Sequence, residues 1–444
     1  MWGHSAFIVD NESVFVTGRP LDVKTLLRIS RLPPSLAKLT NGLTSFLQNA
    51  MPDATLFGLM DPKGDSADSV YERGEKVELP KNEIPMKIAT SLGVTSVVTE
   101  SGRVYMMGSN MYGQCGVDAV DREFVFGLKE CVKFSSETKS PSSPGKVKVK
   151  VPFITDVALG LQHAVAISQC GSVYSWGKGL RGQTGVGFEN LRSPQKVIFK
   201  KEHTVKEVTS ASDRVLDLKA KLVAAGMNHS AIVDQHGSVY IWGKLVKLEE
   251  EGEINNKEDD DHRNGGRVDA SEPVKVLDGS DIKGEIVGLE CGMAHTAVLV
   301  FDESSGRNNG RFHVYYHGLW AQNVDAMGGS ISNNVEDAFS TKFVKIWSYE
   351  KKSVNENVKI FGGFDFTVLV EDTVKGDTDS RTDSRTRTRT LRVGDLWGDG
   401  LGAKGNVEED GCDWFNDGGE IGNGNESVKT VCNGWKHKVI VVER

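Results

Sequence analysis

One segment of the chain recurs along the sequence, and this repetition constrains the fold more than any other feature. Residues 222–243 read LVAAGMNHSAIVDQHGSVYIWG, and residues 156–177 read DVALGLQHAVAISQCGSVYSWG. The same pattern, a glycine followed by a short apolar strand, returns in weaker form elsewhere. The recurring glycines are Gly42, Gly93, Gly160, Gly226, Gly292, Gly363 and Gly434. Because these copies extend over the whole chain, they indicate one repeated structural unit rather than several unrelated domains.

Each copy is predicted to form β structure. Side chains alternate along Ser230–Val233 and along Ser238–Trp242, so every second residue faces the same side of a sheet. The turn between them, Asp234–Gly237, ends in the glycine that short hairpins favour. Two further short strands per copy, such as Pro194–Phe199 and Lys221–Ala225, make about four strands. We therefore expect an all-β, seven-bladed β-propeller of four-stranded blades, forming a single domain over residues 1–444.

The motif within the copies resembles a known repeat. It reads G-x-x-H-[ST], then G-x-V-Y-x-W-G after a turn, and in one copy G-x-x-G-Q-x-G at Gly179–Gly185. These residues are similar to those of the regulator of chromosome condensation repeat family, which implies a seven-bladed propeller. The match holds for three or four copies, since Met107, Phe366 and Phe57 replace motif residues in others. WD-type repeats are the alternative, but their Trp-Asp signature is absent.

Closure of the ring is predicted from the two ends of the chain. Seven Trp-Gly-like strand ends occur along the chain, but the strand that precedes them in each copy occurs eight times when His4–Val9 is counted. We therefore expect the C-terminal strand His437–Val442 to pair with the N-terminal hairpin, and we favour seven blades over eight. Loop or disordered insertions are expected near residues 119–146, 244–272, 321–357, 371–390 and 399–427.

Charge is distributed unevenly along the chain. The net charge is -8, but residues 249–261 carry eight acids and one lysine, and residues 399–426 carry the same excess, so the remainder is mildly basic. An Arg/Ser/Thr-rich tract at 377–392 is expected to be disordered. These three segments are candidate partner-binding loops. Their charged candidates are Glu249, Glu250, Glu251, Asp259, Asp260, Asp261, Glu408, Glu409, Asp410, Arg381, Arg385, Arg387 and Arg389.

Topology predicts on which face of the disc these segments lie. Both acidic segments follow a Trp-Gly-type strand, whereas the Arg-rich tract precedes one. Because successive connections alternate between the two ends of antiparallel strands, we expect the acidic segments on one face and the tract on the opposite face. An acidic face favours a basic partner, such as a histone. Solvated loops without a partner are the simpler alternative.

The sequence offers no pattern of catalytic, metal-ligating or cofactor-binding residues. His163, His229, His295 and His437 share one repeat position, so they fall in separate blades and are expected to bond to backbone in tight turns. Gly177–Gly182 fits G-x-G-x-x-G but precedes no predicted helix, which dinucleotide binding needs. The six cysteines lack C-x-x-C spacing. No cofactor, metal site or catalytic residue is therefore predicted.

The function predicted from these features is a non-enzymatic protein-interaction or regulatory scaffold that acts as a monomer. The family resemblance implies guanine-nucleotide exchange on a small Ran-like GTPase as an alternative, and chromatin or histone binding as a second. The expected partner is therefore a protein, either a small GTPase or a basic protein, and the acidic loops disfavour direct nucleic-acid binding. The absence of a signal peptide and of a long apolar run argues against a membrane protein and favours the cytoplasm or the nucleus.

Overall fold

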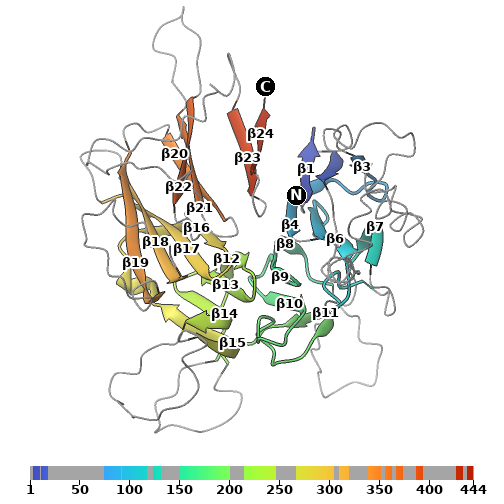
Figure 1. Cartoon of the computed structure of the whole chain (residues 1–444), viewed down its shortest axis with the longest axis horizontal. Helices are drawn as coiled ribbons and strands as arrows, with labels where there is room; N and C mark the ends of the chain where they lie inside the picture. The colour runs from blue at the N-terminus through green and yellow to red at the C-terminus, as the bar shows by residue number, and fades with distance from the viewer. Residues whose placement is uncertain are drawn as a thin grey trace, which may run out of the picture. The chain divides into compact units, whose positions relative to one another are not determined.

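The structure, a computed structural model, consists of β-strands joined by loops (Figure 1). It describes residues 4–10, 12–18, 75–91, 93–117, 124–131, 134, 151–200, 215–246, 267–304, 310–319, 339–351, 356–362, 367–373, 387–393, 427–433 and 438–443. The chain divides into two compact units: unit 1 comprises Met1–Leu180 and Val186–Ile198, and unit 2 comprises Arg181–Gly185 and Phe199–Arg444.

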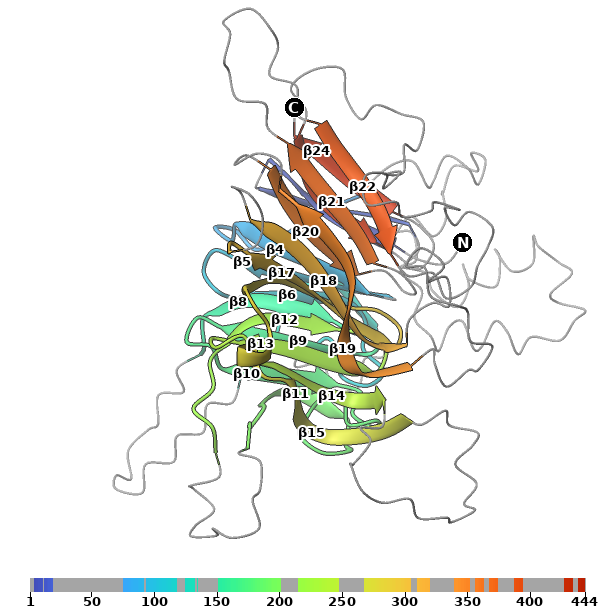
Figure 2. The ribbon, with the colours of Figure 1, turned by 90° about the vertical axis from the view of Figure 1, so that its left-hand side faces the viewer.

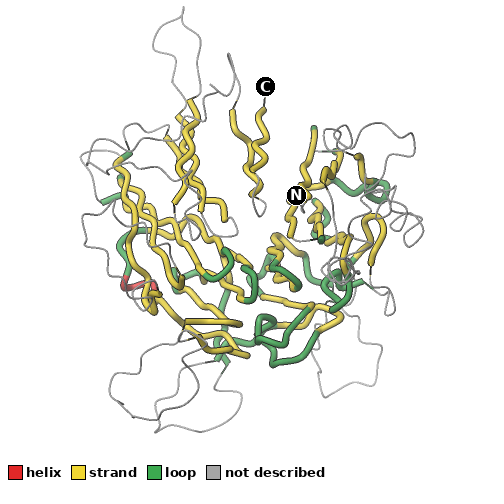
Figure 3. Tube along the Cα trace, in the orientation of Figure 1, coloured by secondary structure: helices red, strands yellow, loops and turns green. Residues whose placement is uncertain are grey.

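The strands follow one another along both units with a single short helical turn among the described residues (Figure 3). Those of unit 1 are β1 (His4–Val9), β2 (Ser13–Gly18), β3 (Glu75–Val77), β4 (Pro85–Ser91), β5 (Val94–Thr99), β6 (Val104–Ser109), β7 (Phe124–Glu130), β8 (Ile154–Leu159), β9 (His163–Ser168), β10 (Val173–Gly177) and β11 (Leu191–Lys196). Those of unit 2 are β12 (Ala220–Ala225), β13 (His229–Asp234), β14 (Val239–Val246), β15 (Arg267–Leu277), β16 (Glu285–Cys291), β17 (His295–Asp302), β18 (Arg311–Leu319), β19 (Phe339–Glu350), β20 (Glu356–Gly362), β21 (Thr367–Thr373), β22 (Arg387–Val393), β23 (Ser427–Asn433) and β24 (Lys438–Glu443), with the 3-10 turn η5 (Gly279–Asp281). In the parts of the chain that are described, no helix is long and apolar enough to cross a membrane.

Consecutive strands pair into antiparallel sheets, as the repeats predict. Four sheets have four strands, namely β4–β7, β8–β11, β12–β15 and β16–β19. The sheets β1–β3 and β20–β22 have three strands each, and β23 pairs with β24. The all-β class and the four-stranded unit are therefore confirmed. The ring of seven blades, its closure by the terminal strands and the single domain over the whole chain stay predictions.

The apolar core lies between the faces of neighbouring sheets. In unit 1 the cluster between β4–β7 and β8–β11 contains Val104, Met106 and Trp176. In unit 2 the first strands of successive sheets, β12, β16, β20 and β23, are neighbours in that order. Within the β12–β15 sheet the strands follow one another in sequence order (Figure 2). Each sheet therefore buries its apolar faces only when another copy of the repeat covers them, which is how repeat proteins are stabilised.

Backbone geometry explains the glycine that follows the tryptophan in the repeat. Gly177 and Gly243 have φ angles of 98° and 96°, which L side chains rarely adopt. A Cβ at Gly177 would also clash with the carbonyl oxygen of Gln162, and one at Gly243 with that of Asn228. The carbonyl in each case immediately precedes the histidine that begins the second strand. Only glycine allows the third strand to end this close to the start of the second.

One copy of the repeat is out of register with the expected alignment. Val94 pairs with Gly108 as His163 pairs with Gly177, so Val94 rather than a histidine begins the second strand of the β4–β7 sheet. The connection that leads to it is one residue shorter than the one before His163. Gly93 is therefore not equivalent to Gly160, and the equivalence predicted from sequence is wrong at this copy. The weak copy at residues 36–58 lies outside the described residues.

Several strands extend into segments that the sequence assigned to insertions. Strand β22 begins at Arg387, within the Arg-rich tract that was expected to be disordered, and pairs along its length with β21. Strands β7, β15 and β19 likewise occupy parts of the predicted insertions near 119–146, 244–272 and 321–357. The alternation of arginine and threonine at 385–390 suits a strand because it places like side chains on one face. Most of the other residues of these insertions lie outside the described residues.

Candidate functional site

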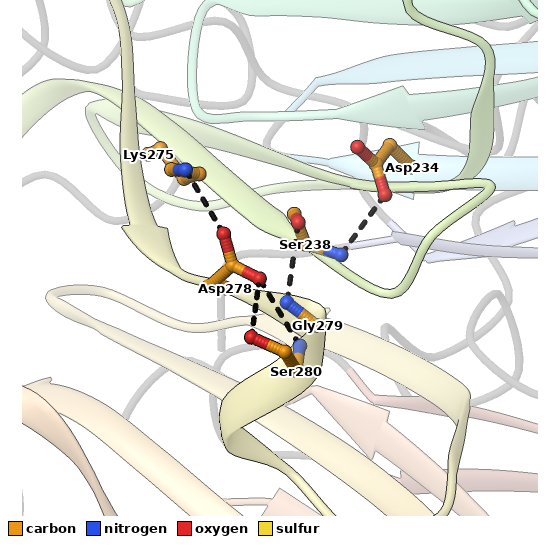
Figure 4. Close-up of polar contacts among 6 residues, drawn as sticks. All are labelled: Asp234, Ser238, Lys275, Asp278, Gly279 and Ser280. Atoms are coloured by element: carbon orange, nitrogen blue, oxygen red, sulfur yellow. Dashed lines mark hydrogen bonds and ion pairs between the residues drawn. The ribbon is translucent and has the colours of Figure 1, made fainter. Parts of the chain in front are cut away.

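The turn between the second and third strands of the β12–β15 sheet is fixed by a buried aspartate. One carboxylate oxygen of Asp234 accepts hydrogen bonds from the backbone N–H of His236 at 2.8 Å and of Ser238 at 2.9 Å. The Ser238 hydroxyl in turn accepts the N–H of Gly279 at 3.2 Å, which ties this turn to η5 (Figure 4). Gly237 has a φ of 83°, so the turn glycine predicted from the sequence is confirmed.

A second aspartate stabilises the neighbouring connection (Figure 4). Asp278 accepts the backbone N–H of Ser280 at 3.1 Å and the ammonium of Lys275 at 3.0 Å. These hydrogen bonds, that from the Ser280 backbone first, lower the pKa of Asp278 to about 2. Together with the contacts of Asp234, these hydrogen bonds stabilise two neighbouring loops. The donors and acceptors of this group are satisfied by one another, so it offers no reactive group.

The repeat's tryptophan links each sheet to the loop of the preceding sheet. The indole N–H of Trp176 donates to the carbonyl of Gln114 at 2.8 Å, and that of Trp242 donates to the carbonyl of Gln183 at 2.9 Å. Both indoles are fully buried. The same Gln183 carbonyl accepts the Ser230 hydroxyl at 2.8 Å. The G-x-x-G-Q-x-G segment therefore presents a carbonyl to the next sheet, and the predicted packing of Trp176 and Trp242 between blades is confirmed; Trp397 lies outside the described residues.

The repeat's histidine makes a second contact between sheets. Nε2 of His229 lies 3.2 Å from the Thr296 hydroxyl of the next sheet, and Nε2 of His4 lies 2.8 Å from the Thr95 hydroxyl. For His229, whose predicted backbone bonding in a tight turn stays a prediction, Nε2 thus contacts a side-chain hydroxyl of the neighbouring sheet. Among the residues that the structure describes, no group of three or more His, Cys, Asp or Glu side chains is placed to hold a metal ion.

The structure describes only two of the charged residues that were predicted as partner-binding candidates, Arg387 and Arg389. Glu249, Glu250, Glu251, Asp259, Asp260, Asp261, Glu408, Glu409, Asp410, Arg381 and Arg385 lie outside the described residues. Arg387 and Arg389 lie on β22, opposite Thr373 and Glu371 of β21. The acidic segments follow β14 and β22, each the third strand of its sheet, whereas the Arg-rich tract joins β21 to β22. The structure brings none of the described candidates together, and their segregation on two faces stays a prediction.

An exposed apolar loop was missed by the sequence analysis. Leu180, Val186 and Phe188, in the connection between β10 and β11, are each more than two-fifths exposed. Beside them the ammonium of Lys178 lies 5.0 Å from the centre of the Tyr112 ring. The segment was interpreted only as a dinucleotide motif and as a turn, and no helix follows it before β11. Apolar residues among closely spaced glycines were the signal that marked an exposed loop.

One cysteine differs from the others in its environment. Cys170 is exposed in the turn between β9 and β10, with its sulfur 3.2 Å from the Ser168 hydroxyl and 3.5 Å from that of Ser172. These hydrogen bonds, that of Ser168 first, lower the pKa of its thiol to about 7. Burial instead raises the pKa of Cys115 and Cys291. The sequence alone did not separate this thiol from the buried ones.

The repeat geometry agrees with a family-level match. Two models described as the regulator of chromosome condensation (RCC1) repeat match residues 101–167 and 154–183, which include the Gln114 and Gln183 loops and Trp176. This part of the chain, residues 101–183, therefore carries RCC1 repeats.

Named relatives of this RCC1 repeat protein include regulators of GTPases. It is 28% identical over 157 residues to the secretion-regulating guanine nucleotide exchange factor of Bos taurus, covering 35% of this chain and 29% of the relative. It is 28% identical over 165 residues to the X-linked retinitis pigmentosa GTPase regulator of Homo sapiens, covering 37% of this chain and 13% of the relative. It is 26% identical over 245 residues to the protein pim1 of Schizosaccharomyces pombe, covering 54% and 38%. The aligned part thus spans less than two-fifths of each relative.

Two solved structures superpose on most of the chain. Human WBSCR16 superposes with a TM-score of 0.49 at 16% identity, covering 83% of this chain and 75% of that one. Prp20p of Saccharomyces cerevisiae, crystallised in a study of its binding to Gsp1p and histones, gives a TM-score of 0.45 at 14% identity, covering 85% and 82%.

Proposed function

We propose that this RCC1 repeat protein is a non-enzymatic protein-interaction or regulatory scaffold, built as a seven-bladed propeller that the terminal strands close. The observation that supports it is the use of the repeat's polar side chains. Trp176, Trp242, His4 and His229 all bond to a neighbouring sheet, so they serve the framework rather than a shared reaction centre. Function then falls to the connecting loops, which vary in length and charge from copy to copy.

The acidic segment 249–261 is the binding element that we favour. It follows β14 in the chain, and β15 makes two ion pairs, one with the β10–β11 connection and one with the β11–β12 connection. Arg181 contacts Asp269 at 2.9 Å, and Lys200 contacts Glu272 at 2.5 Å. The segment itself carries an excess of seven negative charges. This charge suits a basic protein partner, such as a histone, through long-range attraction.

Association kinetics test this element. The full chain and a variant lacking residues 249–261 are measured against purified histone dimers at low and at physiological salt, with a matched control in which the acids become Asn or Gln at constant length. We expect both variants to associate at least tenfold more slowly at low salt, with a weaker salt dependence, because the Debye length shortens to about 8 Å at physiological salt. Unchanged rates at low salt would remove this element from the proposal.

Guanine-nucleotide exchange on a small Ran-like GTPase is the alternative function. It rests on the family resemblance and on the relatives that are a guanine nucleotide exchange factor and a GTPase regulator. Capture of a nucleotide-free GTPase by the tagged chain from its own cells would favour it. Chromatin binding is the second alternative, supported by the mildly basic remainder of the chain. For each of these three functions we propose that the protein is a monomer and that it acts in the cytoplasm or the nucleus.

Closure of the ring is tested by truncation. Removal of residues 436–444 deletes β24 and leaves the edge of β23 unpaired. We expect the melting temperature of the whole chain to fall by several degrees. The matched control removes only Arg444, which follows the last strand. Equal melting temperatures for the truncated and control chains would place the closure elsewhere.

A further inference from the structure

The β16–β19 sheet differs from its neighbours at one repeat position. The third strand of each of these sheets carries a glycine at the same repeat position, namely Gly177, Gly243 and Gly318. The residue before it is Trp176 in β10 and Trp242 in β14, but it is His317 in β18. The His317 side chain is buried, with 3% of the residue exposed. Its ring lies 5.3 Å from the ring of Phe343. A titratable imidazole therefore occupies the place of an indole that holds two sheets together elsewhere.

A second imidazole lies on the same face of β18. Strand alternation places His313, Tyr315 and His317 on one side. His313 is also buried, with 8% of the residue exposed, and among the described residues its Nδ1 has no hydrogen-bond partner. The charged groups that act on it are Lys345 of β19, Asp302 of β17 and Arg311 of its own strand.

This face packs against the β12–β15 sheet. Tyr315 and Phe343 belong to the cluster that joins the two sheets, together with Leu245, Ala270 and Val274 from the opposite side. The residues that the β12–β15 sheet contributes to this cluster are apolar, and an apolar surface disfavours a buried charge. Burial lowers the pKa of His313, Lys345 and Arg311 lower it further, and Asp302 opposes them.

We propose that the contact between the β12–β15 sheet and the β16–β19 sheet is a pH-sensitive joint, which loosens when His313 and His317 are protonated. Both imidazoles are buried in the packed joint, and burial favours the neutral form of His313. An opened joint exposes them to water, where each binds a proton near its ordinary pKa of about 6.5. Acid therefore favours the opened joint, and neutral pH favours the packed one. This inference is independent of the proposed function.

Hydrogen exchange of the full chain at pH 7.5 and pH 5.5, corrected for the pH dependence of intrinsic exchange, tests the joint. The proteins compared are the natural chain and the variant His313→Gln with His317→Gln, which cannot gain charge at these positions. We expect protection of residues 311–319 to fall at least tenfold more in the natural chain than in the variant. Residues 163–177 serve as the internal control, and their protection should change equally in both proteins.

The single variant His317→Trp provides a second test if the double variant does not fold at pH 7.5. It restores the residue that β10 and β14 carry, and it should reduce the acid-dependent loss of protection at residues 311–319. His295, which is also buried, is retained in every protein, so its titration contributes equally. An identical fall in protection in the natural chain and in whichever variant folds would overturn the proposal.

Discussion

Two contacts between sheets, one in each unit, share a plan and differ in chemistry. In unit 1 the contact between β4–β7 and β8–β11 is apolar and is completed by Trp176 bonding to the Gln114 carbonyl. In unit 2 the contact between β12–β15 and β16–β19 has His317 at the equivalent position and His313 beside it. The comparison teaches that the repeat preserves the shape of the contact while its polar group can change. The first contact should therefore be insensitive to mild acid and the second sensitive.

Removal of the indole should give the largest effect on this comparison. Trp176→Ala is expected to cost about 3 to 5 kcal/mol of unfolding free energy, because it leaves a large cavity and an unpaired carbonyl. Urea unfolding monitored by fluorescence measures it. Leu180→Ala, at an exposed position of the same unit, is the control and should change the free energy little. A loss below about 1 kcal/mol for Trp176→Ala would contradict the role of the indole.

Acid should weaken the β16–β19 sheet by the next largest amount. Burial lowers the pKa of His295 to about 4. Because the unfolded chain binds the proton first, its contribution is complete above pH 6.5 and is lost as the pH falls toward 4. The loss is about 3 kcal/mol. Unfolding free energies between pH 7.5 and 4 measure it, and His295→Gln should flatten the profile. A variant with the same pH dependence as the natural chain would show that His295 does not titrate as described.

The hydrogen bond of the indole should contribute a smaller share. Trp242→Phe keeps most of the packing but leaves the Gln183 carbonyl with the Ser230 hydroxyl alone, and we expect a loss of about 1 to 2 kcal/mol. Met107→Leu, at the same repeat position in β6, is the matched control because methionine donates no such bond. Equal costs for the two substitutions would assign the effect to shape alone.

Ion pairs between the first strands should contribute least. Lys87 contacts Asp156 at 2.6 Å in unit 1, and Lys221 contacts Glu285 in unit 2. Since these side chains are largely in contact with solvent, Lys87→Ala or Lys221→Ala should cost less than about 1 kcal/mol, and the cost should disappear in 1 M salt. Thermal unfolding at two salt concentrations measures both. A salt-independent cost would mean that the lysine stems stabilise by packing instead.

The sequence predicted what lies within one copy of the repeat. The hairpin around Gly237 and the strand that carries Trp242 and Gly243 follow from alternation and turn chemistry over about 20 residues. Contacts between copies were not predictable in the same way. His229 reaches Thr296, 67 residues away, and nothing local indicates that its partner is a hydroxyl rather than a carbonyl. The misassigned Gly93 arose because one connection is a residue shorter, which a pattern of glycines does not reveal.

The central claim, that this RCC1 repeat protein acts by binding rather than by exchange, is tested most directly by nucleotide release. A Ran-type GTPase loaded with a fluorescent guanine nucleotide is mixed with the full chain at micromolar concentration, and the release rate is compared with the spontaneous rate. The account predicts no acceleration. A tenfold or greater acceleration, which corresponds to about 1.4 kcal/mol of barrier, would contradict it and assign the protein to the exchange factors.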